Sequence, residues 1–343
     1  MRSTLGGMAL VLNGRCIHRP VTGVERYALQ LHGALQRLGI PFRTLAPRTT
    51  TGVAGHLWEQ VLLPLRLRRG EVLLGPANTG PWLVRDQLLV VHDLAWLEHP
   101  AWFSGLFAAW YRLLLPALIP RVRGLLTVSR TMADDLTRHF PTTTGRVHVV
   151  PPAVELHHDH AIVPGGPPLF LFMGPGDPRK DVGTFQRAFA LLRARHPGAQ
   201  AFIVGEAGRV FARRELRPGP GETWSGRVDD DALFTLMRRA TALVMPSRYE
   251  GFGLPILEAL ARGCPVIASD LPVFRDTFGE APVRVPAGDA ATLADAMNGL
   301  IVDPQARTTR IGAGLAVAAR FSFAAQDAAL QQALRARVPE LSR

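Results

Sequence analysis

The segment 246–259 reads Pro-Ser-Arg-Tyr-Glu-Gly-Phe-Gly-Leu-Pro-Ile-Leu-Glu-Ala and places two carboxylates around a glycine-rich turn between a strand and a helix. The amides of Gly251 and Gly253, together with those of the helix N-terminus, can form an anion site suited to a diphosphate. Glu250 lies at the mouth of this turn, and Glu258 lies about one turn into the helix, so both carboxylates can face one ligand. A carboxylate there suits a bidentate hydrogen bond to ribose hydroxyls. The alternative is a structural turn whose carboxylates only favour the helix dipole.

A second segment, 174–181, reads Gly-Pro-Gly-Asp-Pro-Arg-Lys-Asp and also lies between a strand and a helix. It contains Lys180, the only lysine among the 39 Lys and Arg residues of the chain. A compact ammonium with three donors suits a phosphate, and Arg179 beside it can add a planar fork. The pair could therefore neutralise a leaving diphosphate. A solvated charge pair at a helix N-terminus is the simpler alternative.

Two further segments lie in the first half of the chain. His92 and Asp93 follow the apolar run 88–91, so they are expected at the carboxyl end of a strand, although a lone histidine there is often structural. The loop 22–27, Thr-Gly-Val-Glu-Arg-Tyr, opens a helix, and Gly23 is the position at which its backbone could approach a ligand.

Short apolar runs alternate with amphipathic stretches along the chain, which predicts an α/β protein with parallel sheets. In the first half, strands are expected over 9–12, 42–45, 72–74, 88–91, 124–128 and 147–150, and helices over 24–38 and 130–139. In the second half, strands are expected over 169–173, 200–204, 242–245 and 265–268, and helices over 182–195, 230–239, 255–262, 290–300, 305–319 and 323–337. The result is two Rossmann-like halves, with ligands expected at the carboxyl ends of the strands and in the cleft between the halves.

Composition excludes several classes of protein. The chain has 343 residues, 47% of them hydrophobic and 20% charged, which excludes a disordered, collagenous or coiled-coil chain. Cys16 and Cys264 cannot form a disulfide framework and are expected to be free thiols in a reducing compartment. We find no secretory signal and no run of about 18 apolar residues. The net charge is +11, but the arginines are scattered, so nucleic acid is not an expected partner.

One cluster of aspartates and one rich in histidine have residue types that can bind a metal ion, but we do not interpret either as a metal site. Asp229-Asp230-Asp231 is expected to cap a helix, and His157-His158-Asp159-His160 has adjacent side chains that cannot readily converge on one ion. An aromatic and apolar stretch at 102–119 could contact an anionic membrane with the help of arginines in the same domain, or it could be a core helix. The apolar residues considered are Trp102, Phe103, Leu106, Phe107, Trp110, Tyr111, Leu114 and Leu115.

The segment 246–259 resembles the Glu-x7-Glu element of the retaining GT-B glycosyltransferases of family 4. The resemblance extends over most of the chain, through Val128-Ser129, Gly205, Gly226-Arg227-Val228, the segment 263–268 and Phe321-Ser322-Phe323. The last of these has Phe323 where the family has Trp. The segment 174–181 resembles a Pro-Arg-Lys variant of the family's phosphate loop, with Pro175 where many relatives carry an arginine.

The resemblance implies a GT-B fold with four parts. Residues 1–155 would form an acceptor domain, 156–168 a linker, 169–320 a nucleotide-sugar domain, and 321–343 a helix that crosses back to the N-terminal domain. The protein would be a metal-independent, retaining hexosyltransferase without a cofactor, and its partners would be a nucleotide-sugar and a glycan or lipid-linked saccharide. It would be cytoplasmic, with peripheral membrane contact if the stretch 102–119 is at the surface.

The resemblance also implies roles for individual residues. Lys180 and Arg179 would stabilise the departing diphosphate, Glu250 would hold sugar hydroxyls, and His92 would orient the sugar. Glu258 would hold the ribose. The residues expected to bind the donor are Gly23, Gly174, Arg179, Lys180, Gly226, Val228, Glu250, Gly251, Phe252, Gly253, Leu254 and Glu258.

The loops at 22–27 and 174–181 look most like those of bacterial mannosyl- or rhamnosyltransferases of polysaccharide and O-antigen assembly, which favours GDP-mannose as the donor. A UDP-sugar-dependent hexosyltransferase of the same fold is the first alternative, and a catalytically silent nucleotide-binding scaffold is another. A phosphorylase would need a cofactor lysine, but Lys180 already has a role. A nicotinamide dehydrogenase is disfavoured because no G-x-G-x-x-G follows the first strand.

Overall fold

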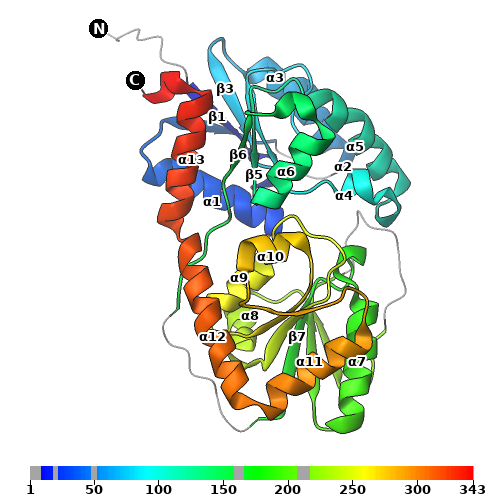
Figure 1. Ribbon diagram of the computed structural model, residues 1–343. Helices are drawn as coiled ribbons and strands as arrows, with labels where there is room; N and C mark the ends of the chain where they lie inside the picture. Colours follow the sequence, from blue (N-terminus) through cyan, green and yellow to red (C-terminus); the bar gives the residue numbers. More distant parts are fainter. Residues whose placement is uncertain (1–8, 18–21, 48–51, 158–165, 207–216, 343) are drawn as a thin grey trace. The chain divides into compact units, whose positions relative to one another are not determined.

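The computed structural model describes residues 9–17, 22–47, 52–157, 166–206 and 217–342, which form two compact units (Figure 1). Unit 1 takes in the described residues of Met1–Leu97, Ala109–Ala153 and Phe323–Arg343, and unit 2 those of Glu98–Ala108 and Val154–Ser322. Each unit is built on a six-stranded sheet in which every pair of neighbouring strands is parallel.

The sheet of unit 1 has the strand order β2-β1-β3-β4-β5-β6. Its strands are β1 (Ala9–Asn13), β2 (Phe42–Leu45), β3 (Glu71–Gly75), β4 (Gln87–Val91), β5 (Gly124–Thr127) and β6 (Val147–Val149). The direction of the chain reverses between β1 and β3, which makes their carboxyl ends the switch point at which open α/β sheets bind ligands. The central strand β4 is buried along its whole length, as expected for a parallel strand covered on both faces.

The helices of the first half of the chain are α1 (Gly23–Arg37), α2 (Gly52–Leu57), α3 (Leu63–Arg66), α4 (Ala95–Glu98), α5 (Gly105–Leu118) and α6 (Arg130–His139). A π-helical turn, Trp58–Leu62, joins α2 to α3. The last helix of the chain, α13 (Phe323–Arg337), also belongs to unit 1. Arg37 of α1 forms a two-bond fork with Asp327 of α13 at 2.7 Å, which ties the two helices together.

The sheet of unit 2 has the strand order β12-β11-β10-β7-β8-β9. Its strands are β7 (Leu169–Met173), β8 (Gln200–Val204), β9 (Glu222–Gly226), β10 (Ala242–Met245), β11 (Val266–Ser269) and β12 (Val283–Val285). The helices are α7 (Val182–Arg195), α8 (Asp230–Arg239), α9 (Leu254–Leu260), α10 (Pro272–Phe278), α11 (Ala290–Val302) and α12 (Pro304–Ala318). The order is that of a doubly wound dinucleotide-type sheet, with its switch point between β7 and β10.

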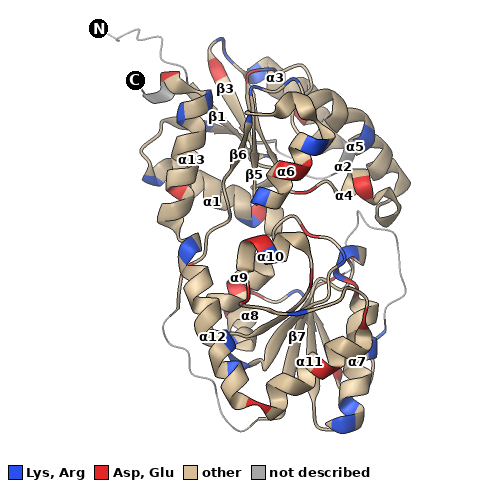
Figure 2. Ribbon diagram, in the orientation of Figure 1, with Lys and Arg blue, Asp and Glu red and all other residues tan. Residues whose placement is uncertain are grey.

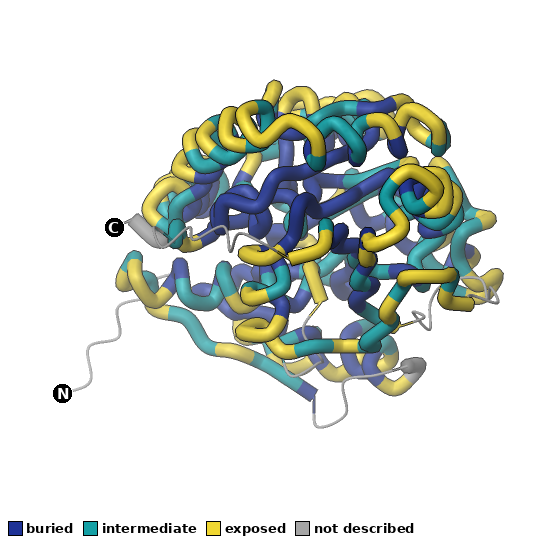
Figure 3. The backbone as a smooth tube through the Cα atoms, turned by 90° about the horizontal axis from the view of Figure 1, so that it is seen from below, coloured by how far each residue is buried: buried dark blue, intermediate teal, exposed yellow. Residues whose placement is uncertain are grey.

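The core of unit 2 is made by apolar side chains of β7 that meet the inner face of α7. Phe170 and Phe172 are fully buried, and Phe172 packs against Phe185, which stacks on Phe189. In Figure 3 the interior segments are buried, whereas helices are exposed along their outer turns. The packing holds β7 rigidly, and therefore the loop that follows it.

The predicted alternation of strands and helices is confirmed, and the predicted α/β fold with it. Six elements were not predicted, namely α2, α3 and α4 in the first half of the chain and β9, α10 and β12 in the second. β9 reads Glu-Thr-Trp-Ser-Gly and lies at a sheet edge, where burial is partial and no apolar run is needed. Residues 98–108, expected in the first domain, group with unit 2, and most of the expected linker lies outside the described residues.

The stretch 102–119 is largely the helix α5, and it does not present its apolar residues as one surface. Leu114 and Leu115 are buried in unit 1, and the neighbouring aromatic side chains are half-buried. Leu113 on the same helix is 74% exposed. Of the residues singled out from the sequence, Leu106 is the exposed one, at 80%, so any apolar contact surface on α5 involves Leu106 and Leu113 and not the others.

Basic and acidic residues are interspersed over both units (Figure 2). The net charge of +11 therefore reflects many separate arginines, several of which form ion pairs with nearby carboxylates.

Candidate functional site

Two loops of unit 2 leave the sheet at its switch point. The segment 174–181 follows β7 and the segment 246–253 follows β10, and these strands are hydrogen-bonded neighbours, with Phe170 opposite Ala242. Their crossover connections run in opposite directions, so the loops diverge and leave room for a ligand. The two segments singled out from the sequence are thus brought together by the strand order.

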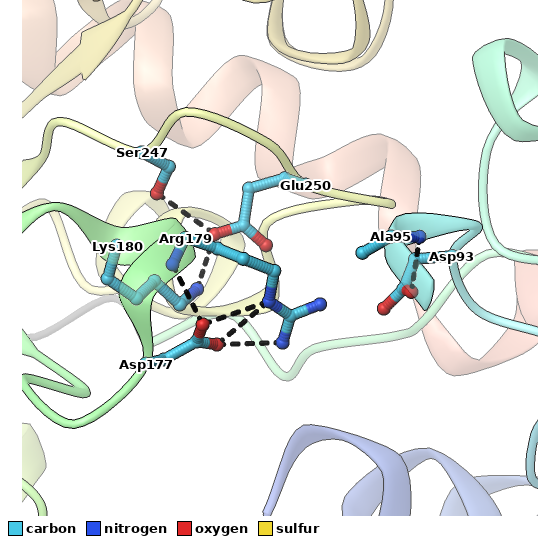
Figure 4. Close-up of polar contacts among 7 residues, drawn as sticks. All are labelled: Asp93, Ala95, Asp177, Arg179, Lys180, Ser247 and Glu250. Atoms are coloured by element: carbon cyan, nitrogen blue, oxygen red, sulfur yellow. Dashed lines mark hydrogen bonds and ion pairs between the residues drawn. The ribbon is translucent and has the colours of Figure 1, made fainter. Parts of the chain in front are cut away.

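One direct contact between the two loops is the ion pair of Lys180 with Glu250. The Nζ of Lys180 donates a hydrogen bond to Oε1 of Glu250, and the Oγ of Ser247 donates to the same oxygen at 3.0 Å (Figure 4). The side chains of Lys180 and Glu250 are 14% and 10% exposed. The pair is therefore shielded from water, where a charge–charge interaction is stronger than at an open surface.

The other cations of these loops are also paired with carboxylates. Arg179 donates from Nε to both carboxylate oxygens of Asp177 at 3.0 Å and from Nη2 to one of them at 2.7 Å. Arg248 donates from Nε to Asp181 at 2.7 Å, and its backbone N–H donates to the carbonyl of Arg179 at 2.7 Å. These bonds link the loop after β7 to the loop after β10.

Asp181 holds an unusual backbone conformation at this junction. Its φ of 51° lies in the left-handed region, which is uncommon for a residue other than glycine. Its side chain accepts hydrogen bonds from the N–H of Thr184 at the start of α7 and from Arg248. Burial raises the pKa of this carboxyl, but the hydrogen bonds from Arg248 and Thr184 outweigh burial, so the net pKa is lowered. The carboxylate is thus charged and supports both loops.

The helix α9 begins where the glycine-rich turn ends. Gly253 is its N-cap with φ 99°, and a Cβ there would lie 2.7 Å from Cε1 of Phe274. Phe252 is 5% exposed and packs edge-on against Phe278 and Phe321. The aromatic cluster below the turn holds the backbone of the turn in place.

The remaining expected donor residues on this loop lie in or beside α9. Gly251 is buried, Leu254 is the first residue of the helix, and Glu258 lies in its second turn, where it is 5% exposed. Arg262 donates to the backbone carbonyl of Glu258 at 3.0 Å.

The strands β8 and β9 bring two further glycines toward the loop after β7. Gly205, after β8, would place a Cβ 3.2 Å from Cδ of Pro175 and 3.3 Å from the amide nitrogen of Gly174. Its own N–H donates to the carbonyl of Gly226, the last residue of β9, at 2.7 Å. Val228 follows at half-burial. Gly174, Gly226 and Val228 therefore lie at the same edge of the sheet as Lys180.

His92 belongs to unit 1 and follows β4. Its backbone N–H donates to Oδ1 of Asn78 at 2.6 Å, and its Nε2 lies 2.8 Å from the carbonyl oxygen of Pro76. Tyr27 packs edge-on against its ring at 5.0 Å. Burial lowers the pKa of His92, so the neutral imidazole is favoured, with Nε2 donating to Pro76.

Gly23 is the first residue of α1 and is exposed, with open space where a Cβ would lie. The preceding Thr22 and the following Glu25 form a capping box that starts the helix. Tyr27 is 1% exposed, donates to the carbonyl of Val150 at 2.7 Å, and has a pKa raised by burial. It is a structural residue of unit 1.

Several site residues were not singled out from the sequence. Asp177, Asp181, Ser247 and Arg248 lie within the two segments that were quoted, so their position was the available signal. A buried network at the end of β1 was also missed. In it Glu59, 1% exposed, accepts from Arg15 at 2.9 Å and from Asn13 at 2.8 Å.

The acidic cluster at 229–231 caps a helix, as predicted. Asp229 accepts a hydrogen bond from the N–H of Ala232 at 2.8 Å at the start of α8. His157 is half-buried, and residues 158–160 lie outside the described residues. In the parts of the chain that the structure describes, no group of three or more His, Cys, Asp or Glu side chains could hold a metal ion.

None of the helices among the described residues combines the length and the apolar character needed to span a bilayer. Cys16 and Cys264 are both buried and neither forms a disulfide with a described residue. Burial raises the pKa of the Cys264 thiol to about 12.

Two family profiles match the chain. The profile described as Glycosyl transferases group 1 matches residues 155–314, and the profile described as Glycosyltransferase Family 4 matches residues 82–158. The first covers most of unit 2, including both loops at the switch point, and the second includes His92.

Individual proteins also resemble the chain. The phosphatidyl-myo-inositol mannosyltransferase of Mycolicibacterium smegmatis is 32% identical over 320 residues, which are 83% of this chain and 82% of that protein. The glycogen synthase of Mycobacterium tuberculosis is 29% identical over 226 residues, 62% of this chain, and the chain spans about half of its length (54%). The structure of sucrose-phosphate synthase from Thermosynechococcus elongatus has a TM-score of 0.73 at 20% identity, with 95% of this chain and 98% of that chain covered. The last likeness concerns the fold.

Proposed function

The chain belongs to the group 1 glycosyl transferases, and from this we propose that it transfers a hexose from a nucleotide-sugar donor to a saccharide acceptor. The observation that carries the proposal is the contact of Lys180 with Glu250, between the loops after β7 and β10. Two loops at the switch point of a doubly wound sheet offer a cation for phosphate and a carboxylate for hydroxyl groups, which are the two parts of a nucleotide-sugar.

Each of the proposed donor contacts has a chemical basis in unit 2. Lys180 stabilises the negative charge of the departing diphosphate, and Arg179 adds to it when its fork turns from Asp177. The N–H groups of Phe252 and Gly253 and the carboxylate of Glu250 hold sugar hydroxyls. Glu258, nearly buried on α9, accepts hydrogen bonds from the ribose.

We adopt a front-face mechanism with retention of configuration. The bond between the hexose C1 and the phosphate oxygen breaks, and its electron pair passes to that oxygen. The acceptor oxygen bonds to C1 on the same face, and the acceptor proton passes to the departing phosphate. A glycosyl–enzyme adduct trapped and found by mass spectrometry would contradict this mechanism. His92→Ala is expected to lower kcat if His92 orients the sugar.

GDP-mannose is the favoured donor. Two observations support this choice. The loops at 22–27 and 174–181 resemble those of mannosyltransferases, and the M. smegmatis relative is named as a mannosyltransferase. The alternative donor is a UDP-sugar. The alternative function is that of a catalytically silent scaffold, which binds a nucleotide but transfers no sugar.

Calorimetry with GDP, UDP, ADP and dTDP, without added metal, tests the donor site. One diphosphate is expected to bind best, and Lys180→Ala is expected to weaken it by about 10- to 100-fold, as for the loss of one charge-assisted phosphate contact. The matched control is Arg195→Ala. It also removes one positive charge from unit 2, but Arg195 lies at the far end of α7, about 20 Å along the helix from Lys180.

The outcomes of this titration separate the alternatives. Binding that is weakened by Lys180→Ala but not by Arg195→Ala supports the proposed site. Binding that requires a divalent ion, or that Lys180→Ala leaves unchanged, contradicts it. Binding without sugar transfer in the presence of acceptors favours the scaffold.

We further propose that unit 1 contacts an anionic membrane through a defined surface, the α2–α5 surface, and that the acceptor is lipid-linked. The exposed apolar side chains of this surface are Leu57, Val61, Leu62, Leu65, Trp82, Leu83 and Leu113. Leu57 is the last residue of α2, Val61 lies in the π-helical turn, and Leu65 lies in α3. Leu65 and Leu83 are 78% and 74% exposed.

The α2–α5 surface consists of three segments, residues 54–70, 81–85 and 109–121, which contact one another within unit 1. His56 of α2 packs edge-on against Trp110 of α5 at 5.7 Å. Gln60 accepts from the N–H of Trp82 at 3.0 Å. The guanidinium of Arg121, just after α5, lies 4.8 Å from the ring centroid of Trp82.

The charge of the α2–α5 surface favours anionic lipid as its partner. Its exposed cations are Arg66, Arg68, Arg69, Arg85, Arg112 and Arg121. Residues 54–70, 81–85 and 109–121 contain one acidic residue, Glu59, and its side chain is buried. Apolar side chains ringed by cations match the interface of a membrane with negative headgroups.

A further inference from the structure

The candidate donor site is charge-balanced in the structure. Three cations of the loops after β7 and β10 each pair with one carboxylate. The pairs are Arg179 with Asp177, Lys180 with Glu250, and Arg248 with Asp181. A diphosphate that enters this site meets no net excess of positive charge from the side chains of these loops, and it must compete with carboxylates for the donors that it needs.

Two of the three carboxylates also accept hydrogen bonds from backbone N–H groups, and these bonds keep them in place. Asp177 accepts from the N–H of Arg179 at 3.0 Å at the start of the short helix Pro178–Lys180. Asp181 accepts from the N–H of Thr184 at the start of α7. A ligand that displaced either carboxylate would leave a helix terminus without its cap, which is unfavourable.

Glu250 differs from both. In the described part of the chain its carboxylate accepts hydrogen bonds from two side chains, Lys180 and Ser247, and both reach Oε1. Figure 4 shows the second carboxylate oxygen directed away from Lys180 and Ser247. Glu250 can therefore exchange its partners without disturbing a helix terminus.

We propose that Glu250 makes the site discriminate between the nucleotide-sugar and the nucleoside diphosphate that remains after transfer. This rests on the proposed function, in which unit 2 binds a nucleotide-sugar. The hexose of the donor supplies hydroxyl groups that donate to Glu250, so the carboxylate keeps hydrogen bonds while Lys180 turns to the diphosphate. The product has no such hydroxyls and adds negative charge next to a shielded carboxylate. Glu250 thereby weakens binding of the product and favours its release.

Calorimetry on the full chain, with GDP against GDP-mannose and UDP against UDP-glucose as the probes, tests this role. The quantity measured is the ratio of the Kd of the diphosphate to the Kd of its nucleotide-sugar. Glu250→Gln keeps the size of the side chain and removes its charge. We expect it to bind the diphosphate about tenfold more tightly and the nucleotide-sugar no more tightly, so the ratio falls about tenfold or more.

Asp177→Asn is the matched control. It removes one negative charge from the same cluster, but the carboxylate it removes pairs with Arg179 and caps a backbone N–H. We expect it to change both Kd values by a similar factor and to leave their ratio unchanged. Glu250→Ala serves as a second variant at the same position, and its ratio should also fall.

The outcomes distinguish this inference from the proposed function. A ratio that falls in both Glu250 variants and not in Asp177→Asn supports the discrimination. A ratio that stays at the wild-type value in Glu250→Gln, or a diphosphate that binds more weakly, overturns it while the donor site stands. If the wild-type protein binds ADP or dTDP instead, that diphosphate and its nucleotide-sugar form the pair to be measured. If it binds none of the four diphosphates and neither nucleotide-sugar, both proposals are wrong.

Discussion

Lys180 is the one lysine in a chain that otherwise uses arginine for positive charge. The structure provides a reason for this choice at the residue scale. The side chain passes beside Gly174, whose Cβ, if present, would lie 3.6 Å from Cγ of Lys180, and it ends on the carboxylate of Glu250. A compact ammonium can bond to this carboxylate or to a phosphate by rotation alone, whereas the planar fork of arginine needs a matched, fixed partner. Arg179 has such a partner in Asp177.

Gly253 is a position where the structure strongly requires glycine, because of both its φ and the space around it. We expect Gly253→Ala to lower the free energy of unfolding by about 2–4 kcal/mol, because the new Cβ meets a positive φ and also clashes with Phe274. Chemical denaturation followed by circular dichroism measures the change.

Gly288→Ala is the control for Gly253→Ala. Gly288 also has a positive φ, 82°, but the nearest atom to its Cβ would be Nη2 of Arg248 at 3.8 Å. Only the backbone strain remains there, so a loss of about 1–2 kcal/mol is expected. Equal losses in the two variants would mean that contact with Phe274 does not matter.

At the scale of elements, the site depends on where helices start. The loop after β7 ends at the N-terminus of α7, and the loop after β10 ends at that of α9, so both loops end at the positive end of a helix.

The α2–α5 surface also depends on how its helices are arranged. Short helices that are buried on one side and joined by a π-helical turn leave their other face in solvent, with arginines at its edge.

Replacement of Arg66, Arg68 and Arg69 by Ala tests the α2–α5 surface. Each basic residue near an anionic bilayer contributes about 1 kcal/mol, so the triple variant should bind vesicles of phosphatidylcholine and phosphatidylglycerol on the order of 100-fold more weakly. Cosedimentation at several vesicle concentrations measures the partition.

A second triple variant controls for net charge. Arg195, Arg238 and Arg239 are exposed in unit 2, and their replacement by Ala removes the same three charges from outside the surface. Vesicle binding should stay within a few-fold of wild type. Similar losses in both triple variants would indicate general attraction by the net charge and no specific surface.

At the scale of the whole molecule, the chain forms two doubly wound units, and its last helix belongs to the first of them. α13 is held in unit 1 by the fork between Arg37 and Asp327 and by Gln326, which donates to the carbonyl of Pro151 at 2.9 Å. Leu330 and Leu334 are buried in unit 1. The folding of unit 1 thus brings together segments that are 290 residues apart in the sequence, as the pair Arg37 and Asp327 illustrates.

Deletion of residues 323–343 should therefore weaken unit 1 and spare unit 2. Each buried leucine of α13 contributes about 1.5–3 kcal/mol through burial. Hydrogen exchange followed by mass spectrometry is expected to find faster exchange in α1 and β6, which contact α13, and unchanged exchange in β7 and β10. Faster exchange throughout both sheets would mean that α13 stabilises the whole chain, contrary to this prediction.

The periodicity of apolar residues was sufficient to predict most elements of both sheets. β7, α7, β8, α8 and β10 have the predicted bounds, because each combines an apolar run or stripe with a clear end signal. The edge strands β9 and β12 were not predicted because both are only partly buried, and β12 has only three residues. Their strand conformation depends on a neighbouring strand, which no local pattern records.

Which residues could do chemistry was decided by the sequence alone, since residue types and their spacing in 174–181 and 246–259 define a cation, carboxylates and glycine-rich turns. Which of them meet was decided by the tertiary structure. The strand order β10-β7 makes neighbours of two segments about 70 residues apart, and so Lys180 contacts Glu250. The pairing of Arg179 with Asp177 and of Arg248 with Asp181, and the split of the apolar stretch at 102–119 into buried and exposed residues, also required the fold. The physical reason is that electrostatic pairing and burial act through space, whereas propensity and periodicity act along the chain.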